Sequence, residues 1–233
     1  MRKKKKRSIM AGLWKFFFRI ILVLVFFSVS QVLVFKYINP PGTVNMIWER
    51  LLAQLDQTDY IRPQYSWQDL VKISPHLRQA VLASEDQRFL THSGFDFKEI
   101  KIVIENMVEN HQFRGASTIS MQTARSLFLP SSRSLFRKAA EAWYTILIEG
   151  FWDKQRIFEV YLNTVDWGTH LVGAQAGAQG YFFCDAGQLT KPQAALMAAI
   201  LPSPHKWSAK NPSAYIRNRQ QRILKQMLAM PLL

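Results

Sequence analysis

The sequence predicts an all-α protein. Several stretches between residues 75 and 230 repeat apolar residues with the period of a helix, and none alternates apolar and polar residues as a strand does. Apolar residues make up 48% of the chain, whereas glycine and proline number ten each, which argues against disorder and against a turn-rich β protein. A chain of 233 residues has room for one domain and an accessory segment.

The N-terminal part predicts a membrane anchor. A basic tail at 1–12 precedes an apolar run at 13–35, whose longest uncharged part, 20–35, is 16 residues long. Lys15 and Arg19 can extend their charged ends toward the head groups, which brings the span to the roughly 20 residues that a transmembrane helix needs. We therefore expect a cytoplasmic tail at 1–12 and one transmembrane helix at 13–35.

Charge predicts the orientation of this helix. The first 19 residues carry eight basic side chains and no acidic one, so the positive-inside rule places the N-terminus in the cytoplasm and the chain beyond residue 36 in the periplasm. The remaining chain is moderately basic, which suits an anionic ligand or a membrane surface, and we expect no nucleic-acid partner. Two alternatives are a signal peptide cleaved near Ser30 and a nuclear-localisation run.

A connector and one helical domain follow the anchor. Proline and glycine mark 36–67 as an extended connector that holds a short helix at 46–57, and this helix can lie on the membrane surface. Residues 68–233 form one all-α unit, in which Thr190 and Gln193 have the spacing of a capping box. The helical stretches expected there are 75–85, 97–110, 118–129, 135–152, 154–163, 191–201 and 214–230. A lone Cys184 excludes an intrachain disulfide and is compatible with either redox compartment.

Two adjacent carboxylates, Glu85 and Asp86, follow an apolar helix and precede a His-x-Gly turn. A carboxylate at a helix end beside apolar surface is a candidate general base, because desolvation raises its pKa. The alternative is structural: Ser84 and Gln87 can form a capping box, and the two acids can be solvated.

A glycine followed by hydroxyl residues marks a second stretch. Gly115, Ser117 and Thr118 precede a helix, where backbone N–H groups and hydroxyl donors can bind an anion. Arg125 adds positive charge two turns later. An ordinary N-cap is the alternative.

For two further helical stretches, the default interpretation is a structural role. Arg137 and Glu141 have the spacing of a surface ion pair, which contributes little to stability. Ile157 and Tyr161 lie one turn apart on an amphipathic helix, where core packing with Asn163 as C-cap is the default.

In this order and at these separations, the stretches resemble the motifs of glycosyltransferase family 51, which includes the monofunctional biosynthetic peptidoglycan transglycosylases. The family patterns are E-D-x-x-F-x-x-H-x-G, G-G-S-T-I-T-Q-Q, R-K-x-x-E, K-x-x-I-L-E-x-Y-L-N and R-R-x-x-V-L-x-x-M, and the resemblance covers about 68–230. The matching residues are Glu85, Asp86, Phe89, His92, Gly94, Gly115, Ser117, Thr118, Ile119, Gln122, Arg137, Lys138, Glu141, Lys154, Ile157, Glu159, Tyr161, Leu162, Asn163, Arg219, Leu224 and Met227.

Several positions depart from these patterns. They are Ala116, Ser120, Met121, Phe158, Gln220 and Ile223, and Arg125 stands where the family commonly has lysine. Met121 is expected to remove an amide from the wall of the donor site. Gln220 loses a charge that would have faced phosphate.

The resemblance implies a lysozyme-like helical glycosyltransferase domain with a membrane-associated jaw region. It implies lipid II as substrate, a disaccharide-pentapeptide on undecaprenyl diphosphate. Glu85 would deprotonate the C4 hydroxyl of the acceptor, which attacks the anomeric carbon with inversion and releases the diphosphate. Arg125, Arg133 and Arg219 are the cations expected to stabilise that leaving group. Glu141 is the second catalytic residue, which organises these cations or a divalent metal.

The resemblance also implies a set of ligands. The substrate-binding residues expected are Asp86, Phe89, Ser117, Thr118, Gln122, Arg125, Arg133, Asn163 and Arg219. The family allows a magnesium or manganese ion, although the sequence has no metal-ligand cluster of its own, and we expect no organic cofactor. The expected partners are lipid II, the growing glycan chain, the bacterial inner membrane, and cell-division or elongation proteins.

Three other functions are weighed against this one. A hydrolase or lytic transglycosylase can use Glu85 as an acid on the same sugars, but a soluble glycan needs neither diphosphate-binding cations nor an anchor. A non-catalytic scaffold has no need of Glu85 and Glu141. A transpeptidase is excluded, because Ser203 and Lys206 match S-x-x-K only in a proline-flanked loop and no K-T-G follows.

Overall fold

A computed structural model describes residues 2–110, 115–132 and 134–233. The chain divides into two compact units, the first ending at Ile38 and the second comprising Asn39–Leu233. The first unit is a single helix, α1 (Arg2–Tyr37). Its 26-residue portion Gly12–Tyr37 is the one helix among the described residues that is long and apolar enough to cross a membrane, judged by length and composition. At 1.5 Å per residue it measures about 39 Å, which exceeds the roughly 30 Å of a hydrocarbon core.

The second unit is helical with one small sheet. Its elements are α2 (Val44–Leu55), β1 (Gln64–Tyr65), η1 (Leu70–Lys72), α3 (Pro75–Glu85), η2 (Phe89–Thr91), α4 (Phe97–Asn110), α5 (Ile119–Phe128), α6 (Leu135–Phe151), α7 (Lys154–Thr164), β2 (Asp166–Gly168), β3 (Leu171–Val172), α8 (Ala174–Phe182), η3 (Ala186–Gln188), α9 (Lys191–Ile200), α10 (Ala214–Gln226) and η4 (Met227–Ala229). In the sheet, β3 pairs parallel with β1 and antiparallel with β2. The prediction of an all-α fold is confirmed.

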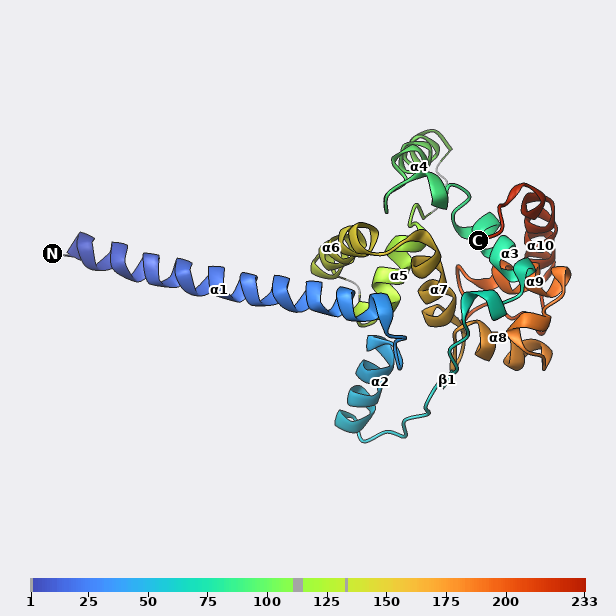
Figure 1. The fold of residues 1–233 in the computed structure, drawn as a ribbon, viewed down its shortest axis with the longest axis horizontal. Helices are drawn as coiled ribbons and strands as arrows, with labels where there is room; N and C mark the ends of the chain where they lie inside the picture. The colour runs from blue at the N-terminus through green and yellow to red at the C-terminus, as the bar shows by residue number, and fades with distance from the viewer. Residues whose placement is uncertain (1, 111–114, 133) are drawn as a thin grey trace. The chain divides into compact units, whose positions relative to one another are not determined.

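Two groups of helices build this unit (Figure 1). Helices α3, α9 and α10 pack against one another, and α5 packs between α6 and α7. The core includes much of α5 and α7, in which seven of ten and seven of eleven residues are buried. Tyr161 and Phe158 of α7, together with Phe89 and Trp167, are among the largest side chains that are fully buried. The core packing expected for this helix is confirmed, while Lys154, Gln155, Arg156 and Glu159 keep a partly exposed polar side.

Side-chain caps fix where several helices begin. Thr118 and Ser134 accept hydrogen bonds from the amides of Met121 and Arg137, at 3.2 and 3.1 Å, which satisfies donors that the first helical turn leaves unpaired. The predicted capping box of Thr190 with Gln193 is confirmed.

Two local predictions are wrong. Ser84 lies inside α3 instead of capping a helix, and the Gln87 side chain donates back to the carbonyl of Ala83 at 3.0 Å. Asn163 is not a C-cap either, because α7 continues to Thr164 and Val165 caps it.

Three surfaces expose large apolar side chains. Helix α2 buries no residue and exposes five large apolar side chains, Ile47, Trp48, Leu51, Leu52 and Leu55. Helix α4 exposes Phe97, Ile102, Ile104 and Met107, and the first turn of α6 exposes Leu135 and Phe136. Apolar surface on this scale is unusual in contact with water and marks sites of membrane or protein contact.

Candidate active site

Glu85 is the last residue of α3, and its carboxylate meets groups from three helices. Its Oε2 accepts a hydrogen bond from Nε2 of Gln122 in α5 at 3.0 Å, and its Oε1 accepts one from the hydroxyl of Ser84 at 3.2 Å. Nη2 of Arg219 in α10 lies 3.8 Å from Oε1. The Glu85 side chain is 10% exposed. The carboxylate is therefore oriented by three donors while part of it still reaches solvent.

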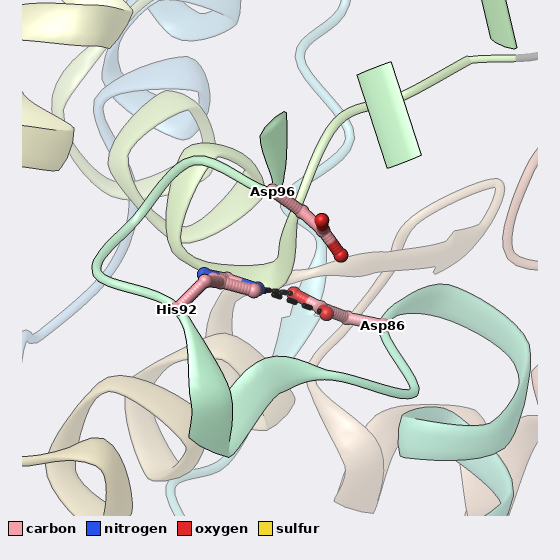
Figure 2. Close-up of side chains that lie close together, drawn as sticks. All are labelled: Asp86, His92 and Asp96. Carbon is pink, nitrogen blue, oxygen red and sulfur yellow. Dashed lines mark hydrogen bonds and ion pairs between the residues drawn. The ribbon is translucent and has the colours of Figure 1, made fainter. Parts of the chain in front are cut away.

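Asp86 turns away from Glu85 and binds the protein interior. Both of its oxygens lie 3.0 Å from Nε2 of His92, as the dashed lines in Figure 2 show. One of them also accepts a hydrogen bond from the amide of Ile119 at 3.0 Å. Since Ile119 begins α5, the negative charge lies at a helix N-terminus, where it is favoured. Asp86 thus ties the turn after α3 to the start of α5.

A second link joins the same two segments. The Thr118 hydroxyl donates to the carbonyl of Gly94 at 2.6 Å while it also caps α5. Gly94 has a φ of +87°, and a Cβ at this position would lie 2.8 Å from Cγ2 of Thr145. Only glycine fits both constraints. The two motif segments consequently form one connected wall.

Two cavities border this wall. The larger, of about 810 Å³, is lined by Gln122, Arg125 and Arg137 on one side and by Asp166 and His205 on another. The smaller, of about 280 Å³, is lined by residues of the first two motifs, among them Glu85, Asp86, Arg88, Gly115, Ser117 and Thr118. The hydrogen bond between Glu85 and Gln122 therefore joins the walls of the two cavities.

Glu141 is fully buried between two cations. Arg137 donates to its Oε2 at 2.9 Å, and Lys138 forms an ion pair with its Oε1. The default expectation of a solvated surface pair is wrong, because the carboxylate has no exposed area. Since Arg137 also lines the larger cavity, Glu141 fixes the position of a cation on that cavity's wall.

Two of the predicted substrate-binding residues point into the protein. Phe89 is 1% exposed and packs against Phe158 with ring centroids 5.9 Å apart. The Asn163 amide accepts a hydrogen bond from the backbone N–H of Gln68 and donates to its carbonyl, both at 2.8 Å. Neither residue lines the two cavities. Arg133 lies outside the described residues.

The remaining predicted residues lie near the cavities. Arg125 is exposed on the larger cavity, and Ser117 and Thr118 line the smaller one. Arg219 approaches Glu85 while its Nε donates to the carbonyl of Ala199 at 3.1 Å.

Two departures from the family pattern leave this wall unchanged. Met121 is 7% exposed and packs in the core, so the expectation that it removes a donor from the site is wrong. Gln220 donates to the carbonyl of Pro192 at 2.7 Å. It therefore binds the start of α9 and does not approach Glu85 as Arg219 does.

One group of three residues within the described part of the chain has the spacing of metal ligands. Atoms of Asp86, His92 and Asp96 lie within 4.8 Å of one another, and Figure 2 shows the Asp96 carboxylate beside the other two side chains. The Asp86 oxygens are already bonded to His92 and to a backbone amide. Asp96 accepts two hydrogen bonds from Arg88, at 2.7 and 3.1 Å, and one from the amide of Glu99.

These bonds decide against a divalent cation at this cluster. Burial alone would raise the pKa of Asp96, but the hydrogen bonds from Arg88 and the Glu99 amide outweigh it and lower the pKa below its usual value. Magnesium requires near-octahedral oxygen ligands, whereas these oxygens are occupied and the Arg88 cation lies beside them. Glu141 is likewise saturated by two cations. Neither this cluster nor Glu141, as bonded here, fits the magnesium or manganese ion that the resemblance allows.

Sequence reasoning missed two contributors to the site. His205 lies on the larger cavity with its Nε2 2.6 Å from the Asp166 carboxylate, yet 39 positions separate the two residues. Tyr161 is fully buried, and its hydroxyl donates to Oε1 of Gln122 at 3.4 Å. Its apolar spacing predicted core packing, and only the fold brings it to the Glu85 wall.

Comparison with known proteins supports the family that the motif residues around Glu85 indicate. The family model described as transglycosylase matches residues 51–228. A biosynthetic peptidoglycan transglycosylase of Pseudomonas putida KT2440 is 47% identical over 209 residues, which cover 90% of this chain and 88% of the relative. Proteins of the same name from Pseudomonas syringae pv. syringae B728a and Xylella fastidiosa 9a5c are 45% and 43% identical, and they cover 90% and 91% of this chain and 89% and 88% of the relatives. The chain belongs to the transglycosylase family.

Proposed function

We propose that this chain is a peptidoglycan glycosyltransferase that polymerises lipid II into glycan strands, with Glu85 as the general base. The observation that carries this proposal is the position of Glu85, a partly exposed carboxylate on the wall between two cavities. Membership of the transglycosylase family supports glycosyl transfer in cell-wall synthesis as the reaction class.

Three acidic residues of the motifs compete for the role of base, and their surroundings separate them. The Asp86 oxygens are bonded to His92 and to the Ile119 amide, so a substrate hydroxyl would have to displace these groups. Glu141 has no exposed area and is held by two cations. Asp86 shares the wall of the smaller cavity with Glu85, but of these three acids only Glu85 also bonds to Gln122 on the wall of the larger cavity. A base placed between the two cavities can take the proton of a bound hydroxyl.

In the proposed reaction, the acceptor sugar binds at the smaller cavity and the diphosphate leaving group at the larger one. The C4 hydroxyl of the acceptor sugar lies at the smaller cavity, passes its proton to Glu85 and attacks the anomeric carbon of the lipid-linked chain. The bond from that carbon to the phosphate oxygen breaks with inversion, and undecaprenyl diphosphate leaves. Its negative charge develops at the larger cavity, where Arg125 and Arg137 supply fixed positive charge. Arg219 and Arg133 complete the set of cations that we assign to the diphosphate.

Glu141 acts indirectly in this scheme. Its carboxylate holds Arg137 against the larger cavity, and fixed charges stabilise a transition state better than mobile ones because they need no reorganisation. Ser117, Thr118 and Gln122 offer hydrogen bonds to the sugars along the same wall. Asp86, Phe89 and Asn163 support the wall from inside.

The membrane parts of the molecule suit substrates that carry a long lipid. Helix α1 supplies an anchor, and the exposed apolar faces of α2, α4 and α6 supply surface for acyl chains. An enzyme tethered to the bilayer meets lipid-linked substrates at a higher effective concentration. We place the N-terminus in the cytoplasm and the catalytic unit in the periplasm, where cell-division or elongation proteins are its expected partners.

The test uses purified full-length protein and labelled lipid II in detergent, with polymer separated from monomer. Wild-type protein should form polymer, and Glu85→Gln should reduce the rate by about 10²- to 10⁴-fold because the proton acceptor is lost. Glu105→Gln is the matched control, since its carboxylate lies exposed on α4, 3.8 Å from Lys101, and should leave the rate unchanged.

Two outcomes contradict the proposal. Wild-type protein that shortens preformed glycan strands and leaves lipid II unpolymerised would be a hydrolase. A Glu85→Gln variant with full polymerase activity would remove Glu85 from the role of base.

A further inference from the structure

We propose that Tyr161 is a positioning residue for the reaction, because it holds the Gln122 side chain with its amide NH₂ toward Glu85. The proposal rests on the role of Glu85 as base, which is itself proposed above. Tyr161 is separated from Gln122 by 39 positions in the sequence, and the packing of α7 against α5 brings the two together.

Two successive hydrogen bonds connect three side chains, from Tyr161 in the core to Glu85 at the site. The Tyr161 hydroxyl donates to Oε1 of Gln122 at 3.4 Å, and Nε2 of Gln122 donates to Oε2 of Glu85 at 3.0 Å. The first bond is long and the second is of ordinary length. Each residue comes from a different helix, namely α7, α5 and α3. The orientation of the base therefore depends on a residue that is fully buried.

The Tyr161 ring has little freedom to move. It stacks on Phe158 with an interplanar angle of 7° and ring centroids 6.5 Å apart. Phe158 in turn packs against Phe89. All three rings are at most 1% exposed, and close-packed interiors hold side chains in fixed rotamers. The hydroxyl is consequently a fixed point against which Gln122 is oriented.

A fixed hydroxyl can select one of the two orientations of a primary amide. The two ends of the Gln122 amide have almost the same shape, but one donates hydrogen bonds and the other accepts them. With the NH₂ end toward Glu85 the amide stabilises the carboxylate, whereas the carbonyl end would repel it. A hydroxyl that donates to Oε1 selects the first orientation.

Tyr161 stays protonated and so keeps this proton to donate. Burial raises its pKa well above the usual value, and the negative charge of Glu85 raises it further. Arg125 acts in the opposite direction, and Asp86 adds the smallest raising effect. Arg219 of α10 lies 3.8 Å from Oε1 of Glu85, and Asp86 follows Glu85 in the chain. Neither contacts the Gln122 amide by a hydrogen bond in the described residues, so Tyr161 is the group that orients it.

The pH dependence of catalysis tests this inference. In Tyr161→Phe the Gln122 amide can turn its carbonyl toward Glu85, which disfavours the ionised carboxylate. The acidic limb of kcat/KM with lipid II should therefore move to higher pH, and kcat/KM near neutrality should fall about two- to tenfold, as for the loss of one hydrogen bond. Tyr181→Phe is the control, because it removes a half-buried hydroxyl that donates to the carbonyl of Trp167 at 2.8 Å and should leave the limb in place.

A double-mutant cycle separates positioning from a general loss of packing. Gln122→Met should shift the acidic limb in the same direction as Tyr161→Phe, since both remove the oriented donor. In the Gln122→Met background, Tyr161→Phe should produce no further shift. Additive shifts, or a limb that stays in place in either single variant, would overturn the proposal. If Tyr161→Phe fails to fold, an unshifted limb in Gln122→Met still overturns the proposal, because no oriented donor would then act on Glu85.

The failure of this inference differs from the failure of the proposed function. An unshifted limb in Tyr161→Phe, with Glu85→Gln inactive, would reject Tyr161 and leave the base in place. An active Glu85→Gln variant would reject the base itself.

Discussion

Glu85 and Asp86 are neighbours in the chain, but their carboxylates face different surroundings. Helix α3 ends at Glu85, and the extended backbone of Asp86, with φ of −159° and ψ of 81°, turns the second side chain inward. Both residues line the smaller cavity, but Asp86 bonds to His92 and the start of α5, whereas Glu85 bonds to Gln122 on the wall of the larger cavity. The helix end therefore gives two identical functional groups different hydrogen-bond partners, which is why we propose Glu85 and not Asp86 as the base.

Arg125 is the cation whose replacement most directly tests diphosphate binding. It is exposed on the wall of the larger cavity, so its removal should cost little stability. Arg125→Ala should lower kcat/KM for lipid II by about 1.5–3 kcal/mol, the range for hydrogen bonds to charged groups, and Arg125→Lys should retain part of the rate because it keeps the charge. Steady-state polymerisation assays on both variants check this.

The control for this prediction is Arg217→Ala, an exposed arginine of α10 that lines neither cavity. Its kcat/KM should equal that of wild type. If Arg125→Ala lowers the yield of folded protein but leaves the specific activity unchanged, Arg125 belongs to the fold and not to the site.

The residues of the site were predictable to different degrees. Motif spacing identified Glu85, Gln122 and Arg219, and the fold brings these three together. The same spacing assigned Asn163 to substrate binding, although it bonds to Gln68, 95 positions away. A sequence pattern shows that a residue type recurs in a family, but the partner of a buried amide is set by tertiary packing.

Helix α7 combines a buried apolar core with polar side chains that hold the segment before α3. Glu159 accepts a hydrogen bond from the amide of Leu70 at 3.0 Å, and Arg156 lies over the Trp67 ring at 5.2 Å. Asn163 pairs with both backbone groups of Gln68. The polar residues of this motif thus attach the connector to the catalytic unit and support α3, whose last residue is Glu85.

Replacement of Asn163 tests this supporting role. Asn163→Ala leaves the N–H and carbonyl of Gln68 without their partners, so the free energy of unfolding should fall by about 2–4 kcal/mol. Denaturant unfolding measures the change, and Asn218→Ala on the exposed face of α10 should have almost no effect. Unchanged stability together with a raised KM for lipid II would instead return Asn163 to the substrate site.

Most helices were predictable from periodicity, but α8 and the sheet were not. Helix α8 consists largely of alanine, glycine and glutamine, so it has no apolar stripe to detect. Its glycines permit close packing, because a Cβ on Gly177 would lie 2.7 Å from Met197. The strands of two or three residues are too short to show alternation. Packing against neighbours, rather than a local pattern, specifies both features.

At the scale of the whole molecule, helix α1 and the second unit, Asn39–Leu233, both expose apolar surface suited to a membrane. The candidate span Gly12–Tyr37 fits a membrane anchor, and α2 and α4 expose apolar faces of the kind that contact lipid reversibly. Because its substrates carry a lipid, the enzyme has to work at the height of their diphosphate groups. The cationic wall of the larger cavity is the part of the catalytic unit that has to meet those groups.

The direction in which the chain crosses the membrane is the last prediction. The eight basic residues within the first 19 should hold the N-terminus in the cytoplasm, so a phosphatase reporter fused after Leu233 should be active and a cytoplasmic reporter at the same position inactive. Replacing the basic residues of positions 2–7 by serine should weaken this preference, since the charge bias sets the orientation. Membrane fractionation of the unmodified protein distinguishes an intact anchor from cleavage near Ser30, which would release a shorter chain. A cytoplasmic C-terminus would contradict the assignment as a whole, because the catalytic unit would then face away from the compartment in which glycan strands are assembled.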